Sequence, residues 1–406
     1  MKITKVDVYQ QQNPDNYYWR PILCRIHTDE GIYGDGEAAI CYAVGSPAAF
    51  SMIVDLSRLI IGMNPLDNEV IWDKLYKTTF WGQNGGPIVF AGISAIDIAL
   101  WDIRGKFYNA PLYQLLGGKR RDNLRAYASQ LTYGWGPDSC QKCCTPEEYA
   151  ANCKIAVAEG YDAVKLDFFN YDVDGTVWNG FGTDTTPMAG EVQTRILSPK
   201  ILATVVDRVA ACREAVGPDV DIIMENHSFP DANSAIQLAQ AVEKYNIFYF
   251  EEPNTPNAKT CKLIADNINI PISHGERVYS RWQYLPYFED QSVRVIQPDL
   301  GNCGGVTEGK KICDMAYTYD VSVQCHVCAS PLSTAPALHL EGVIPNFIIH
   351  EHHCRNLDEY QRKLCTVDFQ PVKGKFKLPE GPGLGCEFTD FALETAKVHV
   401  TVDQGV

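Results

Sequence analysis

The first third of the chain alternates hydrophobic and polar positions and then changes to a helical period. Three segments alternate as half-buried antiparallel strands do, and the last two flank a tight Asp-Glu-Gly turn: ITKVDVYQ, ILCRIHTDEG and IYGDGEA. Helical patterns follow at 47–60, 67–80 and 88–106. The last is apolar on most faces, so we expect it to be the most buried helix. These patterns predict an α+β domain over residues 1–125.

From Leu124 onward, short apolar runs recur at a nearly constant interval, and an ionisable residue follows most of them. Six such residues are Glu225, Glu251, Glu276, Asp299, His326 and Glu351, with successive gaps of 26, 25, 23, 27 and 25. A strand, a helix and their two loops need roughly 25–30 residues, so this spacing predicts a parallel β/α repeat. The strand ends of a closed barrel face one mouth, where we expect the six side chains to converge.

We place the barrel at residues 126–365. One connection, 170–199, is much longer than the others and rich in Gly, Asp and Thr, which is typical of a functional lid. Beyond Glu351 the repeat ends. The remaining segment, 366–406, includes the turn-rich stretch KLPEGPGLGCEFT, and we expect it to pack back on the N-terminal domain.

Charge and hydropathy exclude several classes of function. The net charge is −15 without a compensating Lys/Arg block, which argues against a nucleic-acid partner. No 18-residue apolar run and no signal-peptide pattern occur, so we expect a cytoplasmic protein with no membrane association. An acidic barrel mouth would repel an anionic substrate unless a cation bridged the two.

Fifteen cysteines are scattered through apolar stretches, as reduced buried thiols of a cytosolic protein would be. The one cluster is Cys140, Cys143 and Cys144. A C-x₂-C pair could be half of a zinc site, but no second pair follows at the required spacing. An ordinary loop is the better interpretation.

Glu225, Glu251 and Glu276 are candidate metal ligands. Three carboxylates are hard oxygen donors, which suit Mg²⁺ with water or substrate oxygens completing its octahedron. A single Glu after a strand is more often a helix cap or a solvated loop residue. Three at near-equal spacing, with an Asp and a His at the same interval, favour a metal site.

Lys165 and Asp167 end the second predicted strand, VKLDFF. Side chains two apart on a strand share a face, so both could point into the mouth. A structural Lys–Asp salt bridge and a catalytic role are about equally compatible with this pattern.

Asp299 and His326 follow neighbouring strands. A carboxylate that accepts from one imidazole nitrogen fixes the tautomer and raises the basicity of the other, so His326 is a candidate general base. His227 lies two residues beyond Glu225 and could protonate a leaving hydroxyl; a plain loop histidine is the alternative.

Taken together, these residues resemble the enolase superfamily and, within it, the mandelate racemase subgroup of acid-sugar dehydratases. The resemblance spans essentially the whole chain. It rests on the ordered set SAIDIALWDIRGKFYNAPLYQLLGG, FEEPN, HGER, QPDLGNCGG and PEGPGLG.

The resemblance implies a modified TIM barrel, (β/α)₇β, beneath an α+β capping domain. It assigns one Mg²⁺ to Glu225, Glu251 and Glu276, and C2 proton abstraction to His326 oriented by Asp299, with the metal stabilising an enediolate. Glu351 would hydrogen-bond a substrate carboxylate, for which it must be protonated or share a proton. The 170–199 connection and the loop NPDNYYWR would close over the sugar chain.

Two departures from the subgroup refine this prediction. The third-strand ligand is usually Asp but here is Glu225. Racemases and several dehydratases carry Lys-x-Lys on the second strand, whereas the last position here is Asp167, which removes the usual second base. Galactonate- and mannonate-type dehydratases place a His at the location of His227, as general acid for the 3-hydroxyl.

We therefore predict Mg²⁺-dependent dehydration of an aldonate or aldarate to a 2-keto-3-deoxy acid. The alternatives are an epimerase that uses Lys165 and His326, and a non-catalytic barrel that binds a sugar acid. Candidate substrate contacts are Glu351, Arg277, Asp167, Trp81 and Trp19; Arg277 either reaches a distal carboxylate or only neutralises ligand charge. Barrels of this family usually assemble as homo-oligomers, dimers or octamers.

Overall fold

The N-terminal strands form an antiparallel sheet that is completed by the other end of the chain. The computed structural model describes residues 1–42, 44–136, 141–178 and 196–404. The sheet order is β13-β1-β2-β3. Its strands are β1 (Ile3–Gln10), β2 (Ile22–Thr28), β3 (Tyr33–Ala38) and β13 (Val398–Asp403). Because β13 pairs with β1 along six residue pairs, the C-terminal segment is an integral part of this sheet.

Helices cover one face of the sheet, and the two layers are in very close contact. They are α1 (Ser46–Ser57), α2 (Asn68–Thr78), α3 (Pro87–Tyr108) and the short α4 (Leu112–Leu115). A Cβ atom at Gly34 or Gly36 would lie 2.1 or 2.0 Å from a backbone oxygen of α3. The two glycines of the IYGDGEA strand therefore let the sheet lie directly on the α3 backbone.

The second unit is a parallel barrel. Its strands are β4 (Asn123–Ser129), β5 (Ala163–Asp167), β6 (Asp221–Glu225), β7 (Ile247–Glu251), β8 (Ile272–His274), β9 (Val295–Ile296), β10 (Ser322–Val323) and β11 (His350–His353). They pair in chain order from β4 to β10. Closure comes from β11, which pairs with β4, and from a bridge between Val323 of β10 and Phe347 just before β11. The predicted (β/α)₇β barrel is confirmed.

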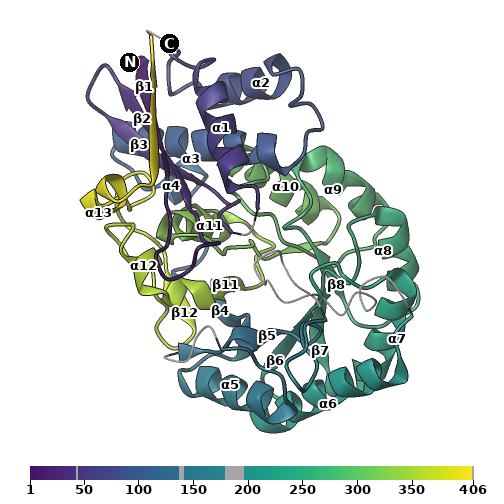
Figure 1. Ribbon diagram of the computed structural model, residues 1–406. Coiled ribbons are helices and arrows are strands. Elements are labelled where there is room, and N and C mark those ends of the chain that lie inside the picture. The colour runs from purple at the N-terminus through teal and green to yellow at the C-terminus, as the bar shows by residue number, and fades with distance from the viewer. Residues whose placement is uncertain (43, 137–140, 179–195, 405–406) are drawn as a thin grey trace.

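Among the described residues, seven helices surround these strands, several of them visible around the rim of the barrel in Figure 1. They are α5 (Pro146–Ala158), α6 (Pro199–Val216), α7 (Ala232–Val242), α8 (Ala258–Ala265), α9 (Ser280–Glu289), α10 (Gly305–Thr318) and α11 (Pro331–Val343). The short elements α12 (Glu359–Arg362), β12 (Lys375–Lys377) and α13 (Asp390–Glu394) lead back to the N-terminal sheet. No described helix is both long enough and apolar enough to cross a membrane.

The expectation that 88–106 is the most buried helix is wrong. Helix α3 buries 14 of its 22 residues, but α11 buries all 13 of its own. Helix α11 packs against β4 and α10 of the barrel and also against β3 and α4 of the N-terminal unit. A helix between two units has no solvent-facing side, and its sequence pattern alone does not show this.

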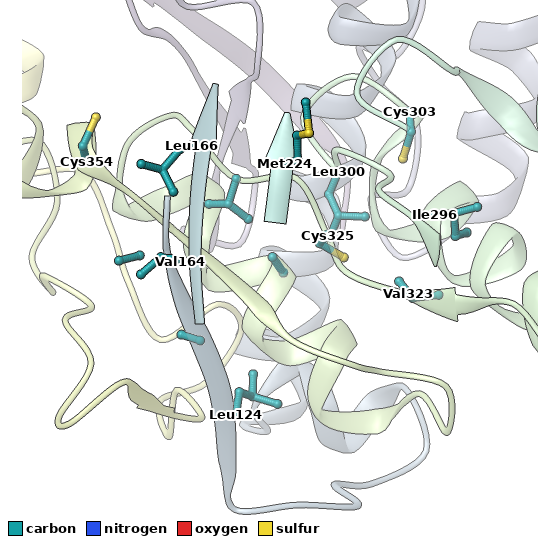
Figure 2. Packing of buried hydrophobic residues seen from close by; sticks show 14 of the residues in the cluster. Leu124, Val164, Leu166, Met224, Ile296, Leu300, Cys303, Val323, Cys325 and Cys354 are labelled. Atoms are coloured by element: carbon teal, nitrogen blue, oxygen red, sulfur yellow. The ribbon is translucent and has the colours of Figure 1, made fainter. Parts of the chain in front are cut away.

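Strand alternation separates the structural core from the functional face. On β5, Val164 and Leu166 belong to the large core that the surrounding helices cover, part of which is drawn in Figure 2. The alternate residues Ala163, Lys165 and Asp167 face the barrel interior, where Ala163 joins a small cluster with Tyr127 and Ile223. Interior side chains at the strand ends are therefore the ones available for chemistry.

Candidate active site

The strand register brings the carboxylates to one level at the mouth. Asp167 of β5 pairs with Glu225 of β6, and Glu225 pairs with Glu251 of β7. Glu276 lies two residues beyond β8, and Asp299 and His326 lie three residues beyond β9 and β10. Each of these side chains is at least 91% buried, so their charges interact in a poorly solvated space.

Lys165 lies at the centre of three glutamates. Its Nζ is 2.6 Å from Glu251, 3.0 Å from Glu351 and 3.1 Å from Glu225. Burial by itself lowers the pKa of Lys165, but the three carboxylates outweigh it and raise that pKa well above its ordinary value. The Lys165–Asp167 salt bridge, one of the two alternatives left open by the sequence, is not among the described ion pairs, because Lys165 reaches glutamates of the neighbouring strands.

Two of these glutamates have oxygens without a partner. Burial and mutual repulsion raise the pKa values of Glu225 and Glu251 to about 8. Oε1 of Glu225 and Oε2 of Glu251 are buried and accept no hydrogen bond from the described residues. Gln130, directly after β4, donates to the other Glu225 oxygen at 2.6 Å. Buried oxygen donors left in this state suit a hard divalent cation.

Glu276 is held differently from the other two. It pairs with Arg277, and its Oε2 lies 3.0 Å from His326 Nε2. Burial tends to raise the pKa of Glu276, but Arg277 and His326 outweigh it and hold that pKa well below its usual range. Arg277 also pairs with Glu252, so in this structure it neutralises carboxylates at the site.

His326 and Asp299 form the expected pair. His326 Nδ1 lies 2.7 Å from Asp299 Oδ2, and the second Asp299 oxygen accepts from Gly301 N at 2.8 Å. Burial lowers the pKa of His326, but Cys328, Glu276 and Asp299 outweigh it and raise that pKa well above its ordinary value. The imidazole is thus fixed at Nδ1, with Nε2 directed toward the glutamates.

A second His–Asp pair lies across the mouth. His227 Nδ1 is 2.6 Å from Asp167 Oδ2, and His227 Nε2 is 3.5 Å from Glu225 Oε1. Asp167 also accepts from Phe169 N at 2.8 Å. The contact of Asp167 with substrate stays a prediction; in the structure one of its oxygens faces His227 and the other accepts from Phe169 N.

Glu351 is held in place by several donors. Its oxygens accept from Ser129 Oγ at 2.6 Å and from Val327 N at 3.0 Å, in addition to the Lys165 contact. Although burial raises the pKa of Glu351, Lys165 and His326 lower it far below the ordinary value. These contacts hold Glu351 in place at the mouth, and its hydrogen bond to a substrate carboxylate stays a prediction.

The two tryptophans predicted to contact substrate, Trp19 and Trp81, differ in burial. Trp19 is buried, stacks on Tyr42 with ring centroids 5.4 Å apart, and packs in a cluster with Ala329 of the loop after β10. Trp81 is 76% exposed. Much of the predicted lid, 179–195, and Cys140 lie outside the described residues. The described Cys143 is buried and bonded to Leu131 O and Asn152, as in an ordinary loop.

Sequence reasoning missed three features of the site: Gln130, the pairing of Asp167 with His227, and Cys328 beside His326. Gln130 directly follows the first barrel strand, so the strand-end rule that found the glutamates could have found it. Asp167 and His227 follow adjacent strands, which is the same signal that connected Asp299 with His326.

Comparison with known proteins identifies the family. Residues 148–392 match the model described as Enolase C-terminal domain-like, and residues 19–117 match that of the Mandelate racemase / muconate lactonizing enzyme, N-terminal domain. The chain belongs to the enolase superfamily, in its mandelate racemase subgroup. The resemblance inferred from the motifs is thereby confirmed.

Relatives match over nearly the full length. A D-galactonate dehydratase of Pectobacterium atrosepticum is 33% identical, across 98% of this chain and 95% of the relative. A D-xylonate dehydratase of Haloferax volcanii is 33% identical, across 97% and 89%. A crystal structure of an enolase superfamily member from Salmonella Typhimurium is 48% identical, with a TM-score of 0.94 over 99% of this chain and 100% of that one.

Proposed function

We propose that the chain is a hydro-lyase that converts an acid sugar, an aldonate or aldarate, to its 2-keto-3-deoxy acid with Mg²⁺ as cofactor. The observation that carries the proposal is the pair of His–Asp dyads on either side of the glutamates. Relatives named D-galactonate, D-xylonate and D-gluconate dehydratase support the substrate class.

Glu225, Glu251 and Glu276 would hold the cation, with the unpartnered oxygens of the first two as ligands. Bound Mg²⁺ would supply positive charge to the substrate carboxylate and so acidify the adjacent C2–H. Once a cation shares the charge of Glu276, the opposite charge that raises the His326 pKa is reduced, and the imidazole becomes available as a base.

His326 Nε2 would then take the C2 proton while Asp299 holds Nδ1 and stabilises the imidazolium that forms. For the acid role, His227 would carry a proton on both nitrogens: Nδ1–H donates to Asp167, and the Nε2 proton would be delivered to the departing 3-hydroxyl. Loss of the C2 proton and the protonated hydroxyl gives water and an enol, which tautomerises to the keto acid.

The epimerase alternative loses support from this geometry. It requires Lys165 as a neutral base, but three carboxylates keep this lysine charged and occupied. A non-catalytic barrel would not need two imidazoles each held by a buried carboxylate.

The direct test is a screen of aldonates and aldarates with Mg²⁺ that measures keto-acid formation. We expect one stereochemical group of substrates to be dehydrated. No turnover with any acid sugar would instead support a binding protein, and inversion without keto acid would support an epimerase.

With a substrate identified, His227→Asn tests the two-histidine mechanism. We expect keto-acid formation to fall about 10²–10⁴-fold, the usual contribution of a general acid, while exchange of the C2 proton with D₂O persists. His399→Asn is the matched control, because His399 also faces an aspartate, Asp7 at 3.1 Å, but on the N-terminal sheet. Unchanged keto-acid formation in His227→Asn would remove His227 from the mechanism.

A further inference from the structure

A pair of buried thiols lies beside His326, and the mechanism above does not use them. Cys328 is two residues beyond His326, whereas Cys41 comes from the segment after β3 of the N-terminal unit. Cys328 is 2% exposed and Cys41 is fully buried. The two thiols interact with each other, and Cys328 also interacts with the His326 imidazole. Thiols from two units of the fold thus meet at the proposed base.

These groups have the spacing of a metal site. Asp299, His326 and Cys328 each offer a ligand atom, all within 4.8 Å of one another, and they form the one such group of three found among the described residues. A tetrahedral zinc site has bonds of about 2.0–2.3 Å, so its ligand atoms are ~3.3–3.8 Å apart. A small movement of side chains would bring these three to that geometry, and Cys41, which interacts with Cys328, would move toward them as the fourth donor.

The donor chemistry differs from that of the glutamate site. The glutamates supply only hard oxygen, which suits Mg²⁺. Two cysteine sulfurs and an imidazole nitrogen, with a carboxylate as the fourth donor, suit a borderline-soft cation such as Zn²⁺. The two positions adjoin, since His326 contacts Glu276 on one side and Cys328 on the other.

The two segments that carry the thiols are held together by the backbone. Ala39 N donates to Gly301 O at 3.0 Å, and a Cβ atom at Gly301 would lie 2.7 Å from Ala39 N. Glu37 of β3 accepts from Ser330 N at 3.2 Å, two residues beyond Cys328. The two thiols therefore lie where these segments are already packed together, so little additional ordering of the chain is needed to bind an ion.

We propose that Cys41, Cys328 and His326, with Asp299, form a second cation site that takes Zn²⁺ or a similar thiophilic divalent ion. Binding releases to solvent the two thiol protons and the proton of the ligating imidazole nitrogen as the metal–ligand bonds form, without any change of oxidation state. Because His326 is the proposed base, an ion held there stops C2 proton abstraction. That inhibition rests on the proposed function, but the binding itself does not.

Titration of the Mg²⁺-loaded protein with Cd²⁺, followed by the ultraviolet thiolate-to-cadmium charge-transfer band, tests the site without reference to activity. We expect one tight equivalent of Cd²⁺, displaced by Zn²⁺. Cys41→Ala and Cys328→Ala should each weaken it by ~10-fold or more, because a lost ligand costs at least as much as a lost supporting contact. Two independent variants keep the test valid if one folds poorly.

Two controls separate this site from others. Cys325→Ala removes the thiol one residue before His326. The Cys325 side chain packs in the hydrophobic core (Figure 2), so this variant should keep the cadmium charge-transfer band. Glu251→Gln impairs the glutamate site and should also keep it. A band unaffected by both Cys41→Ala and Cys328→Ala, or one lost in Glu251→Gln, would overturn the proposal. If Zn²⁺ binds but no acid sugar is turned over, the second site stands and the proposed function fails.

Discussion

The two His–Asp pairs at the barrel mouth are built in the same way. In each, an aspartate belongs to one strand end and the imidazole follows the next strand: Asp167 and His227 on β5 and β6, Asp299 and His326 after β9 and β10. The Nδ1–Oδ2 distances are 2.6 and 2.7 Å. Neighbouring strands of a parallel barrel thus produce an oriented imidazole wherever an aspartate and a histidine occupy these positions.

Their surroundings differ. His227 and the following Ser228 have φ values of 45° and 64°, so the chain after β6 turns sharply and directs the imidazole back over Glu225. The Asp167–His227 pair shares its glutamate with Lys165, whereas the Asp299–His326 pair lies between Glu276 and two thiols. The two pairs show that the strands determine how each imidazole is oriented. The chemical role of each imidazole depends on the side chains next to it.

The largest expected effect comes from removing the base itself. His326→Asn should reduce both the rate of C2 proton exchange and the rate of keto-acid formation, each by about 10²–10⁴-fold. His227→Asn, by contrast, should spare exchange. Parallel measurements of exchange in D₂O and of product would show the difference; retained exchange in His326→Asn would reverse the assignment of base and acid.

Much of this comparison could be predicted from sequence. The interval of 23–27 residues located the barrel and the ends of its last six strands, and it placed Asp299 and His326 together. Asp167 and His227 are 60 residues apart because the long connection separates their strands, which hides the same relation. The partners of Lys165 and Glu351 lie on β4, β6, β7 and β11, and the pattern of a single strand does not show them.

The second-largest effect concerns Lys165, which contacts Glu225 beside the Asp167–His227 pair. Lys165→Met should destabilise the Mg²⁺-free protein by about 3–5 kcal/mol, because the buried carboxylates lose their counter-charge. Thermal denaturation with and without Mg²⁺ would measure this, and Mg²⁺ should restore much of the loss. Lys154→Met, on the exposed face of α5, is the matched control and should have little effect.

The pH dependence of that loss has a definite sign. Glu225 and Glu251 have folded-state pKa values raised to about 8, against about 4.3 in the unfolded chain. The folded state therefore holds more protons between these values, and stability falls as pH rises through this range. The Lys165→Met deficit should be larger near pH 8 than near pH 5; equal or absent deficits would mean that Lys165 is not the counter-charge.

The smallest effect tests whether the two aspartates are equivalent. Asp167→Asn and Asp299→Asn should each reduce keto-acid formation by about 10–100-fold, the usual cost of losing a carboxylate that orients a histidine. Because they support different histidines, only Asp299→Asn should slow C2 exchange. Their pH–rate profiles should also differ, since one substitution alters the acid and the other the base. If Asp167→Asn slows exchange as much as Asp299→Asn does, the two pairs act on the same proton, and a two-base mechanism replaces the acid–base one.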